Sequence, residues 1–230
     1  MHVRIFSTLE ALAEAAADEV EGWLGLDGNG HTLGLAGGTT PRRAYELLAD
    51  RDLPWQEVAA WMTDERHVPT DHPDSNAGMA RRALFDRIPA RLLEVPWRED
   101  ASEAADEYET MLGSVLRSVG GRLEPGMVIL GMGSDGHTAS LFPGSDALDV
   151  TDRDFVATLV PDKGWRLTAT LGLLTRARRT LFLAAGEEKA SAVAEVLSGG
   201  SDLPAARVTA RARDVVWLID TGAARLLDNA

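Results

Sequence analysis

The sequence predicts an α/β fold, with a mainly parallel sheet and helices on both of its faces. Short apolar runs alternate along the chain with longer stretches whose apolar residues recur at helical spacing. Several apolar runs lead into glycine-containing loops that open the next helix, as in repeated strand–loop–helix units. The chain has 230 residues, which is enough for one large domain or two small ones, and we expect a single domain over 1–230.

Helices are expected where a start signal precedes amphipathic periodicity. The expected ranges are 8–23, 40–49, 75–87, 101–118 and 187–198. Ser7 or Thr8 can cap the first helix, and Ser75 can cap the third. In the second helix Thr40 is the expected N-cap and Pro41 the first helical residue, because the N–H that proline lacks has no helical partner there.

Strands are expected at short runs of apolar and β-branched residues. The expected ranges are 32–36, 58–63, 127–130, 155–160, 166–171, 180–184 and 215–219. A turn is expected at 28–30, where the sequence is Gly-Asn-Gly. The irregular stretch 145–154 is the best candidate for the edge of a subdomain.

The composition excludes several classes of function. The net charge of −13 argues against non-specific binding to nucleic acid or to an anionic membrane. No apolar run approaches the roughly 20 residues of a membrane helix, and the first residues lack the features of a signal peptide, so cytoplasmic residence is expected. Without cysteine, the chain has no disulfide, thiolate nucleophile or cysteine-based metal site. An anionic ligand would need a local site built from helix N-termini and a few Arg or Lys side chains.

The most specific motif is the glycine-rich segment 131–144, which reads G-M-G-S-D-G-H-T-A-S-L-F-P-G and follows the buried run 127–130. Ligands of open α/β sheets bind beyond the carboxyl ends of the strands. His137 could therefore be a base, with Asp135 as its orienting carboxylate. The alternative is a loop histidine that bonds only backbone, but the flanking glycines favour a functional role. A metal site is not expected, because no other His or acid lies at helical ligand spacing.

Three further junctions carry residues that suit an anion. Gly37, Gly38 and Thr39 join a predicted strand to a helix, whose unpaired N–H groups suit phosphate or carboxylate, although a simple capped turn is equally possible. Arg166 and Lys189 lie beside predicted strand ends, where they could neutralise a phosphate or remain solvated charges. The loop of Gly37, Gly38 and Thr39 matches neither a P-loop nor a dinucleotide-binding fingerprint, so nucleotide binding is not expected.

The triplet Asp64-Glu65-Arg66 lies at the carboxyl end of the predicted strand 58–63. That position favours a function, and a surface ion pair is the alternative. Asp71, Asp74 and Asn76, which follow, are expected to form turns and caps.

Taken together, these segments resemble the 6-phosphogluconolactonase family, within the superfamily that includes glucosamine-6-phosphate deaminases and isomerases. The matching segments, in family order, are L-A-G-G-T-T-P-R-R-A-Y, D-E-R-H-V-P with S-N following, the 131–144 segment, R-L-T-A-T-L and G-E-E-K-A. The resemblance implies a Rossmann-like three-layer sandwich. It also implies hydrolysis of 6-phosphoglucono-δ-lactone to 6-phosphogluconate in the oxidative pentose phosphate pathway, with no nucleotide or metal cofactor.

The resemblance further implies roles for individual residues. His137 matches the family's catalytic base, and we expect Asp135 or Asp64 to orient it. Gly38, Thr39, Arg166 and Lys189 match positions that hold the substrate phosphate, and Gly37 is placed with them. Asp64, Arg66 and Asp135 match polar residues that line the pocket.

One difference separates this chain from the deaminases that it resembles. Deaminases carry N-E-P-G where this chain has Leu141-Phe142-Pro143-Gly144, and a phenylalanine cannot transfer a proton. They also carry D-E-Y in place of the Asp64-Glu65-Arg66 triplet. A sugar-phosphate isomerase or deaminase and a non-catalytic sugar-phosphate-binding protein remain the alternatives. The expected partner is a small phosphorylated sugar lactone, and the expected state is a monomer or a weak homodimer.

Overall fold

The computed structural model describes residues 1–26 and 31–227, so the turn expected at 28–30 lies outside the described residues. Seven strands form the central sheet: β1 (His2–Phe6), β2 (Thr32–Leu35), β3 (Ala59–Met62), β5 (Arg91–Leu93), β8 (Met127–Gly131), β11 (Arg179–Ala184) and β12 (Val215–Asp220). Their order is β1-β12-β11-β8-β2-β3-β5, and every neighbouring pair is parallel. The prediction of a mainly parallel sheet is confirmed.

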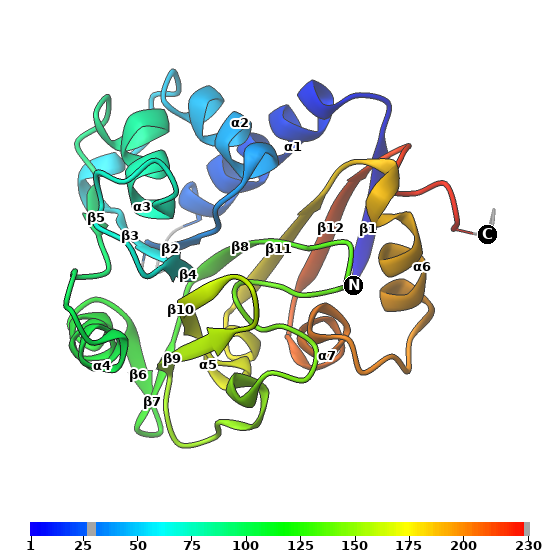
Figure 1. Cartoon of the computed structure of the whole chain (residues 1–230). Coiled ribbons are helices and arrows are strands. Elements are labelled where there is room, and N and C mark those ends of the chain that lie inside the picture. The colour runs from blue at the N-terminus through cyan, green and yellow to red at the C-terminus, as the bar shows by residue number, and fades with distance from the viewer. Residues whose placement is uncertain (27–30, 228–230) are drawn as a thin grey trace.

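The helices are α1 (Leu9–Leu24), α2 (Thr39–Leu48), α3 (Asn76–Ala80), α4 (Ala101–Leu112), α5 (Leu171–Thr175), α6 (Ala190–Ser198) and α7 (Pro204–Arg211). In Figure 1, α1 and α2 lie on one side of the sheet, and α5 and α7 lie on the other. The helices therefore cover both faces, as predicted. Buried apolar side chains form one cluster that extends from Leu12 in α1 to Ala224 beyond β12.

Two predicted strands lie outside the parallel sheet. β9 (Phe155–Val160) and β10 (Gly164–Ala169) form an antiparallel sheet with the short β4 (Asp64–Arg66), in the order β4-β10-β9. The predicted range 166–171 is wrong at its end, because Thr170 stops the strand. Its hydroxyl accepts a hydrogen bond from the backbone N–H of Leu173 and caps α5.

Two of the three predicted N-cap residues are confirmed. Thr8 caps α1 through the N–H of Ala11, and Ser75 caps α3 through the N–H of Gly78. Beyond α3 the helix continues as a wider π turn over Arg81–Phe85. The prediction of Thr40 as the cap of α2 is wrong, because the helix begins at Thr39 and its N-cap position is Gly38.

The predicted helix over 101–118 ends early, at Leu112. Residues beyond it form the hairpin of β6 (Arg117–Val119) and β7 (Arg122–Glu124). Gly120 and Gly121 make its turn, both with positive φ, which glycine adopts without strain.

The sequence prediction missed β1, β4, β5, the β6–β7 hairpin, α5 and α7. Polar residues interrupt β1, and its burial pattern is almost entirely exposed, so it is recognisable as a strand only through its parallel pairing with β12. In the irregular stretch 145–154, Ala147 and Leu148 are buried. No helix among residues 1–26 and 31–227 is long and apolar enough to cross a membrane.

Candidate active site

The candidate site lies where the connections of the parallel sheet reverse direction. β2 and β8 are neighbours, yet the chain continues from β2 toward β3 and β5, and from β8 toward β11 and β12. Loops that leave such a pair in opposite directions open a crevice at the carboxyl ends of the strands. A cavity of about 290 Å³ lies there. The predicted site residues that line it are Gly37, Gly38, Thr39, Asp64, Arg66, His137 and Lys189.

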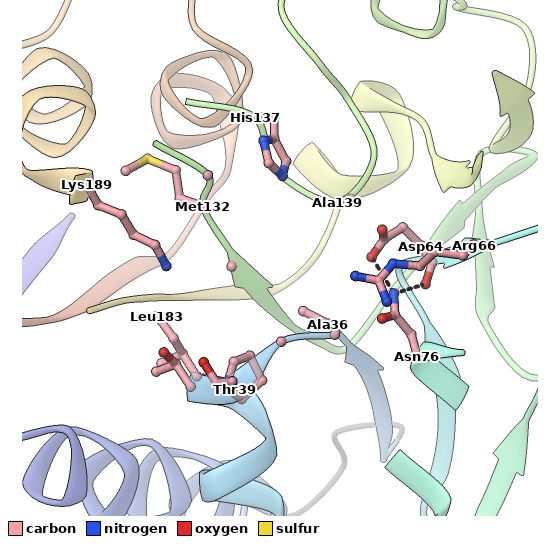
Figure 2. Close-up of a pocket in the computed structure, with 16 residues that line it drawn as sticks. Ala36, Thr39, Asp64, Arg66, Asn76, Met132, His137, Ala139, Leu183 and Lys189 are labelled. Carbon is pink, nitrogen blue, oxygen red and sulfur yellow. Dashed lines mark hydrogen bonds between the residues drawn. The ribbon is translucent and has the colours of Figure 1, made fainter. Parts of the chain in front are cut away.

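Figure 2 shows how these side chains face one another. His137 and Lys189 point into the cavity from separate loops, Arg66 points in from the side of the antiparallel sheet, and Thr39 lies at the start of α2. The structure therefore brings together residues that are far apart in the sequence. Asp135 and Arg166 are the predicted site residues that do not line this cavity.

His137 is held by the carboxylate two residues before it. Its Nδ1–H donates to Oδ1 of Asp135 at 2.5 Å, and its backbone N–H donates to the same oxygen at 3.1 Å. Partial burial raises the pKa of Asp135, but these hydrogen bonds and the nearby imidazole outweigh it and leave the pKa below its usual range. Because Nδ1 carries the proton, Nε2 is the nitrogen with a free lone pair.

Two neighbours pack closely on the imidazole of His137. The ring of Phe142 stacks on it, with 4.2 Å between ring centroids and 25° between the ring planes. Gly133 lies at its edge, where a Cβ would stand 2.1 Å from Nδ1. Only glycine leaves room there for the ring in its observed position.

The loop after β2 brings backbone close to the cavity. A Cβ on Gly37 would lie 1.9 Å from Oδ1 of Asn76, so no larger residue fits beside that amide. Gly38 has φ of +104°, in the region that favours glycine, and it leads into the first turn of α2. The unpaired N–H groups of that turn carry the positive end of the helix dipole, which favours a negatively charged ligand.

Lys189 supplies a cation opposite this helix start. It ends the short 3₁₀ turn Glu187–Lys189 between β11 and α6, and it is partly buried. Burial lowers the pKa of Lys189, although Glu188 and Asp220 oppose the shift. The backbone N–H of Lys189 donates to the main-chain oxygen of Gly186, but its side-chain ammonium forms no hydrogen bond or ion pair with any residue that the structure describes. A partly buried ammonium without a protein partner suits an anionic ligand.

Asp64 is buried and bonded away from the imidazole. The Ser140 hydroxyl donates to its Oδ2 at 2.7 Å, and Nδ2 of Asn76 donates to its main-chain oxygen at 3.0 Å. Burial raises the pKa of Asp64, against the hydrogen bond from Ser140 and the charges of Arg66 and His137. Of the two carboxylates that could orient His137, only Asp135 is hydrogen-bonded to it in the part of the chain that the structure describes.

The surface ion pair that was the alternative for the Asp64-Glu65-Arg66 triplet does not form, because neither acid forms an ion pair with the side chain of Arg66 in the described part of the chain. Glu65 is buried and accepts hydrogen bonds from the backbone N–H groups of Asn76 and Ala77, at 2.6 and 2.8 Å. The guanidinium of Arg66 donates instead to the main-chain oxygen of Asp74 at 2.5 Å. Glu65 therefore anchors the start of α3.

Arg166 lines a second cavity, of about 380 Å³, which adjoins the first and shares Arg66 with it. The two arginines face each other in the antiparallel register of β4 and β10. Burial lowers the pKa of Arg166, and the neighbouring charge of Arg66 lowers it further. Arg166 and Lys189, which were both predicted to hold the substrate phosphate, therefore line different cavities.

Comparison with known proteins identifies the family. The model of the family described as glucosamine-6-phosphate isomerases/6-phosphogluconolactonase matches residues 7–217. The chain belongs to this family.

Its relatives and solved structures agree with that assignment. A 6-phosphogluconolactonase of Synechocystis sp. is 38% identical over 196 residues, covering 82% of this chain and 81% of that protein. One from Nostoc sp. is 38% identical over 199 residues, covering 84% and 82%. The solved 6-phosphogluconolactonase from Trypanosoma brucei superposes with a TM-score of 0.89 at 29% identity, covering 98% of each chain.

Several residues of the site were not predicted as parts of it. Asn76, Met132 and Ala139 line the cavity, and Ser140 holds Asp64. Asn76 was expected as a turn or cap residue, although Ser75-Asn76 is part of a segment that matches the family, and that match could have pointed to it. Within residues 1–26 and 31–227, no three His, Asp or Glu side chains are grouped closely enough to hold a metal ion.

Proposed function

We propose that this member of the family is a carboxylic ester hydrolase that converts 6-phosphoglucono-δ-lactone to 6-phosphogluconate. The observation that carries the proposal is the pairing of His137 with Asp135 in a cavity that also presents an unpartnered lysine. The names of the relatives at 38% identity support the same substrate. Lactone hydrolysis needs an activated water and an anchored substrate, and the cavity has groups suited to both.

His137 acts as the general base. Its Nδ1–H donates to Asp135, so Nε2 can take a proton from a water molecule as the water oxygen attacks C1 of the lactone. The tetrahedral intermediate carries its negative charge on the former carbonyl oxygen, and Arg66 or loop N–H groups stabilise that charge. When the bond from C1 to the ring oxygen breaks, the imidazolium returns the proton to the leaving oxygen. The product acid then ionises to the carboxylate.

The phosphate end of the substrate is bound at the opposite wall. Lys189 supplies a positive charge, and the loop of Gly37, Gly38 and Thr39 presents the N-terminus of α2. Arg166, across Arg66 in the adjoining cavity, contributes to the positive field around the anion. These contacts hold C1 near Nε2, which turns remote binding energy into orientation. They also offset the repulsion from the net charge of −13.

The two alternatives predict different products. A sugar-phosphate deaminase or isomerase would act on glucosamine 6-phosphate, and the family model includes such enzymes. Phe142 disfavours this alternative, because its side chain packs on His137 and cannot carry a proton. A non-catalytic binding protein would bind the sugar phosphate without turnover.

One assay separates the three readings. Freshly generated 6-phosphogluconolactone is mixed with the protein, and its decay is followed against a protein-free control for spontaneous hydrolysis. Catalysed decay that is lost in His137→Ala supports the proposal. Ammonia or fructose 6-phosphate released from glucosamine 6-phosphate would instead support the deaminase or isomerase, and binding with no turnover of either substrate would support the binding protein.

We also predict that residues 1–230 form a single domain and that the protein resides in the cytoplasm. Its partner is predicted to be a phosphorylated sugar lactone, and its state a monomer or a weak homodimer.

A further inference from the structure

We infer that Phe142 is a positioning residue that holds the imidazole of His137 in place and stabilises its protonated form. The inference rests on the proposed role of His137 as the base. It concerns a side chain that does not reach the substrate, because Phe142 is not among the residues that line the catalytic cavity. Phe142 therefore acts through the imidazole.

The contact between the two rings is close and nearly parallel. The ring centroids of Phe142 and His137 are 4.2 Å apart, and the ring planes differ by 25°. Asp135 fixes the Nδ1 atom of the same imidazole. One hydrogen bond leaves a ring free to pivot about the bonded atom, and a flat partner on its face opposes that pivot. Together the two contacts determine where Nε2 lies.

The segment that carries Phe142 is itself well fixed. The Thr138 hydroxyl donates to the main-chain oxygen of Gly131 at 2.8 Å, and the N–H of Leu141 donates to the main-chain oxygen of Thr138 at 3.0 Å. The side chain of Leu141 is fully buried. The N–H of Ser145 donates to the main-chain oxygen of Phe142 at 3.0 Å. The phenyl ring is therefore presented from a rigid loop, as a supporting side chain requires.

The π face of Phe142 also has an electrostatic consequence. An aromatic face is negative and attracts a cation lying against it. During hydrolysis His137 alternates between neutral imidazole and imidazolium, and the face of Phe142 favours the imidazolium. The contact therefore helps most when the base has taken the proton from water, so it acts on the transition state.

Several charged groups, besides the ring of Phe142, also act on the imidazole of His137. Asp135 binds Nδ1, and Asp64 from β4 is close enough to interact with the imidazole. Arg66 and Lys189 lie on other walls of the cavity. From the hairpin between β9 and β10, the Nζ atom of Lys163 approaches the ring of Phe142, 5.7 Å from its centroid. Removing the phenyl ring removes none of these charges, and of them only Lys163 contacts the ring.

The test compares Phe142→Leu with Phe142→Tyr. Leucine keeps an apolar side chain without the π face, whereas tyrosine keeps the face and should restore wild-type behaviour. The pKa of His137 is measured directly by NMR from the imidazole Cε1–H, and the kinetics are measured on the phosphorylated lactone. We expect Phe142→Leu to make the imidazolium of His137 less stable and to lower kcat about tenfold, with KM changed less than about twofold.

Phe6→Leu is the matched control. Phe6 is also an aromatic residue with a cation against its ring, since Arg4 lies 5.3 Å from its centroid, but it lies on β1 away from the cavity. Its replacement should leave both the His137 titration and kcat unchanged. If Phe142→Leu fails to fold, Phe142→Met provides a second variant with a flexible apolar side chain.

The outcomes distinguish this inference from the proposed function. A leucine or methionine variant with wild-type His137 titration and wild-type kcat overturns the inference. So does a loss of kcat that tyrosine does not restore and that no pKa change accompanies. A wild-type protein without lactonase activity would refute the proposed function, yet the titration would still report whether Phe142 stabilises the imidazolium.

Discussion

Replacing Gly133 with alanine tests the proposed base through its geometry rather than by removing it. The Cβ of alanine would lie 2.1 Å from Nδ1 of His137, 2.2 Å from its Cε1 and 2.6 Å from Oδ1 of Asp135. Ordinary van der Waals contact begins near 3.4 Å, so the imidazole must move by about 1.3 Å. The φ angle of Gly133 is not positive, so alanine places no strain on the backbone itself.

The size of the effect follows from that displacement. A shift of about 1 Å in a catalytic group can cost on the order of a hundredfold in rate, which corresponds to about 2.7 kcal/mol in the barrier. We therefore expect Gly133→Ala to lower kcat roughly a hundredfold, while KM for the phosphorylated lactone changes little because the anion-binding wall is untouched. Initial rates of lactone decay, corrected for spontaneous hydrolysis, measure both constants.

The control for this experiment is Gly22→Ala in α1, where a Cβ would meet nothing within 4 Å. It should keep wild-type kinetics and gain slight stability, as alanine does in a helix. A folded Gly133→Ala protein with wild-type turnover would refute the reasoning, because the base could not then require the observed position of the imidazole.

Three other predictions concern the groups around the imidazole and the anion-binding wall. Asp135→Asn should lower kcat by on the order of a hundredfold, because an amide no longer enforces the Nδ1–H tautomer, and a pH–rate profile would show whether the base still titrates. Lys189→Met should weaken binding of 6-phosphogluconate about tenfold or more in calorimetry, yet raise the unliganded Tm. Burial lowers the pKa of Lys189 in the folded protein, so its protonated form destabilises the fold at low pH, and this gain in Tm should shrink as pH rises through that lowered pKa. Gly37→Ala should cost about 1–3 kcal/mol of stability in denaturant unfolding because its Cβ would lie 1.9 Å from Oδ1 of Asn76, and adding Asn76→Ala should recover part of that loss.

The sequence was sufficient to predict the parallel strands that carry the site. β8 is a continuous apolar run, and residues 127–130 are fully buried, as a central strand covered on both faces requires. Because parallel strands all end at the same edge of a sheet, polar residues directly after β2, β3, β8 and β11 were bound to converge. His137, Lys189 and the Gly38 loop each follow the end of such a strand, and the resemblance to the family assigned them to one site.

Strand partners could not be predicted in the same way. The runs 155–160 and 164–169 have strand character, but nothing local tells whether such a run joins the main sheet or pairs elsewhere. In the structure they pair antiparallel with each other and with β4. Arg166 therefore faces Arg66, at a distance from Lys189 that residue spacing did not reveal. The choice between Asp135 and Asp64 as the partner of His137 likewise depended on three-dimensional contacts, since Ser140 and Asn76 bind Asp64.

The short strand β4 explains why three adjacent charged residues have different surroundings. Successive side chains of a strand point to opposite faces, so Asp64 and Arg66 share the face that lines the cavity. Glu65 points the other way and accepts the backbone N–H groups at the start of α3. That anchor fixes Asn76, whose amide in turn holds Asp64 and requires glycine at position 37.

In the neighbouring strand β10, Arg166 lies directly opposite Arg66 and Thr168 lies opposite Asp64, so these side chains share the same face of the antiparallel sheet. Two arginines are thus held face to face beside the cavity, and the burial and repulsion that lower the pKa of Arg166 would both be relieved by a bound anion. Asp64, Asp74 and Glu65 offset part of that repulsion, and we predict that an anionic substrate binding beside the two arginines would offset more of it.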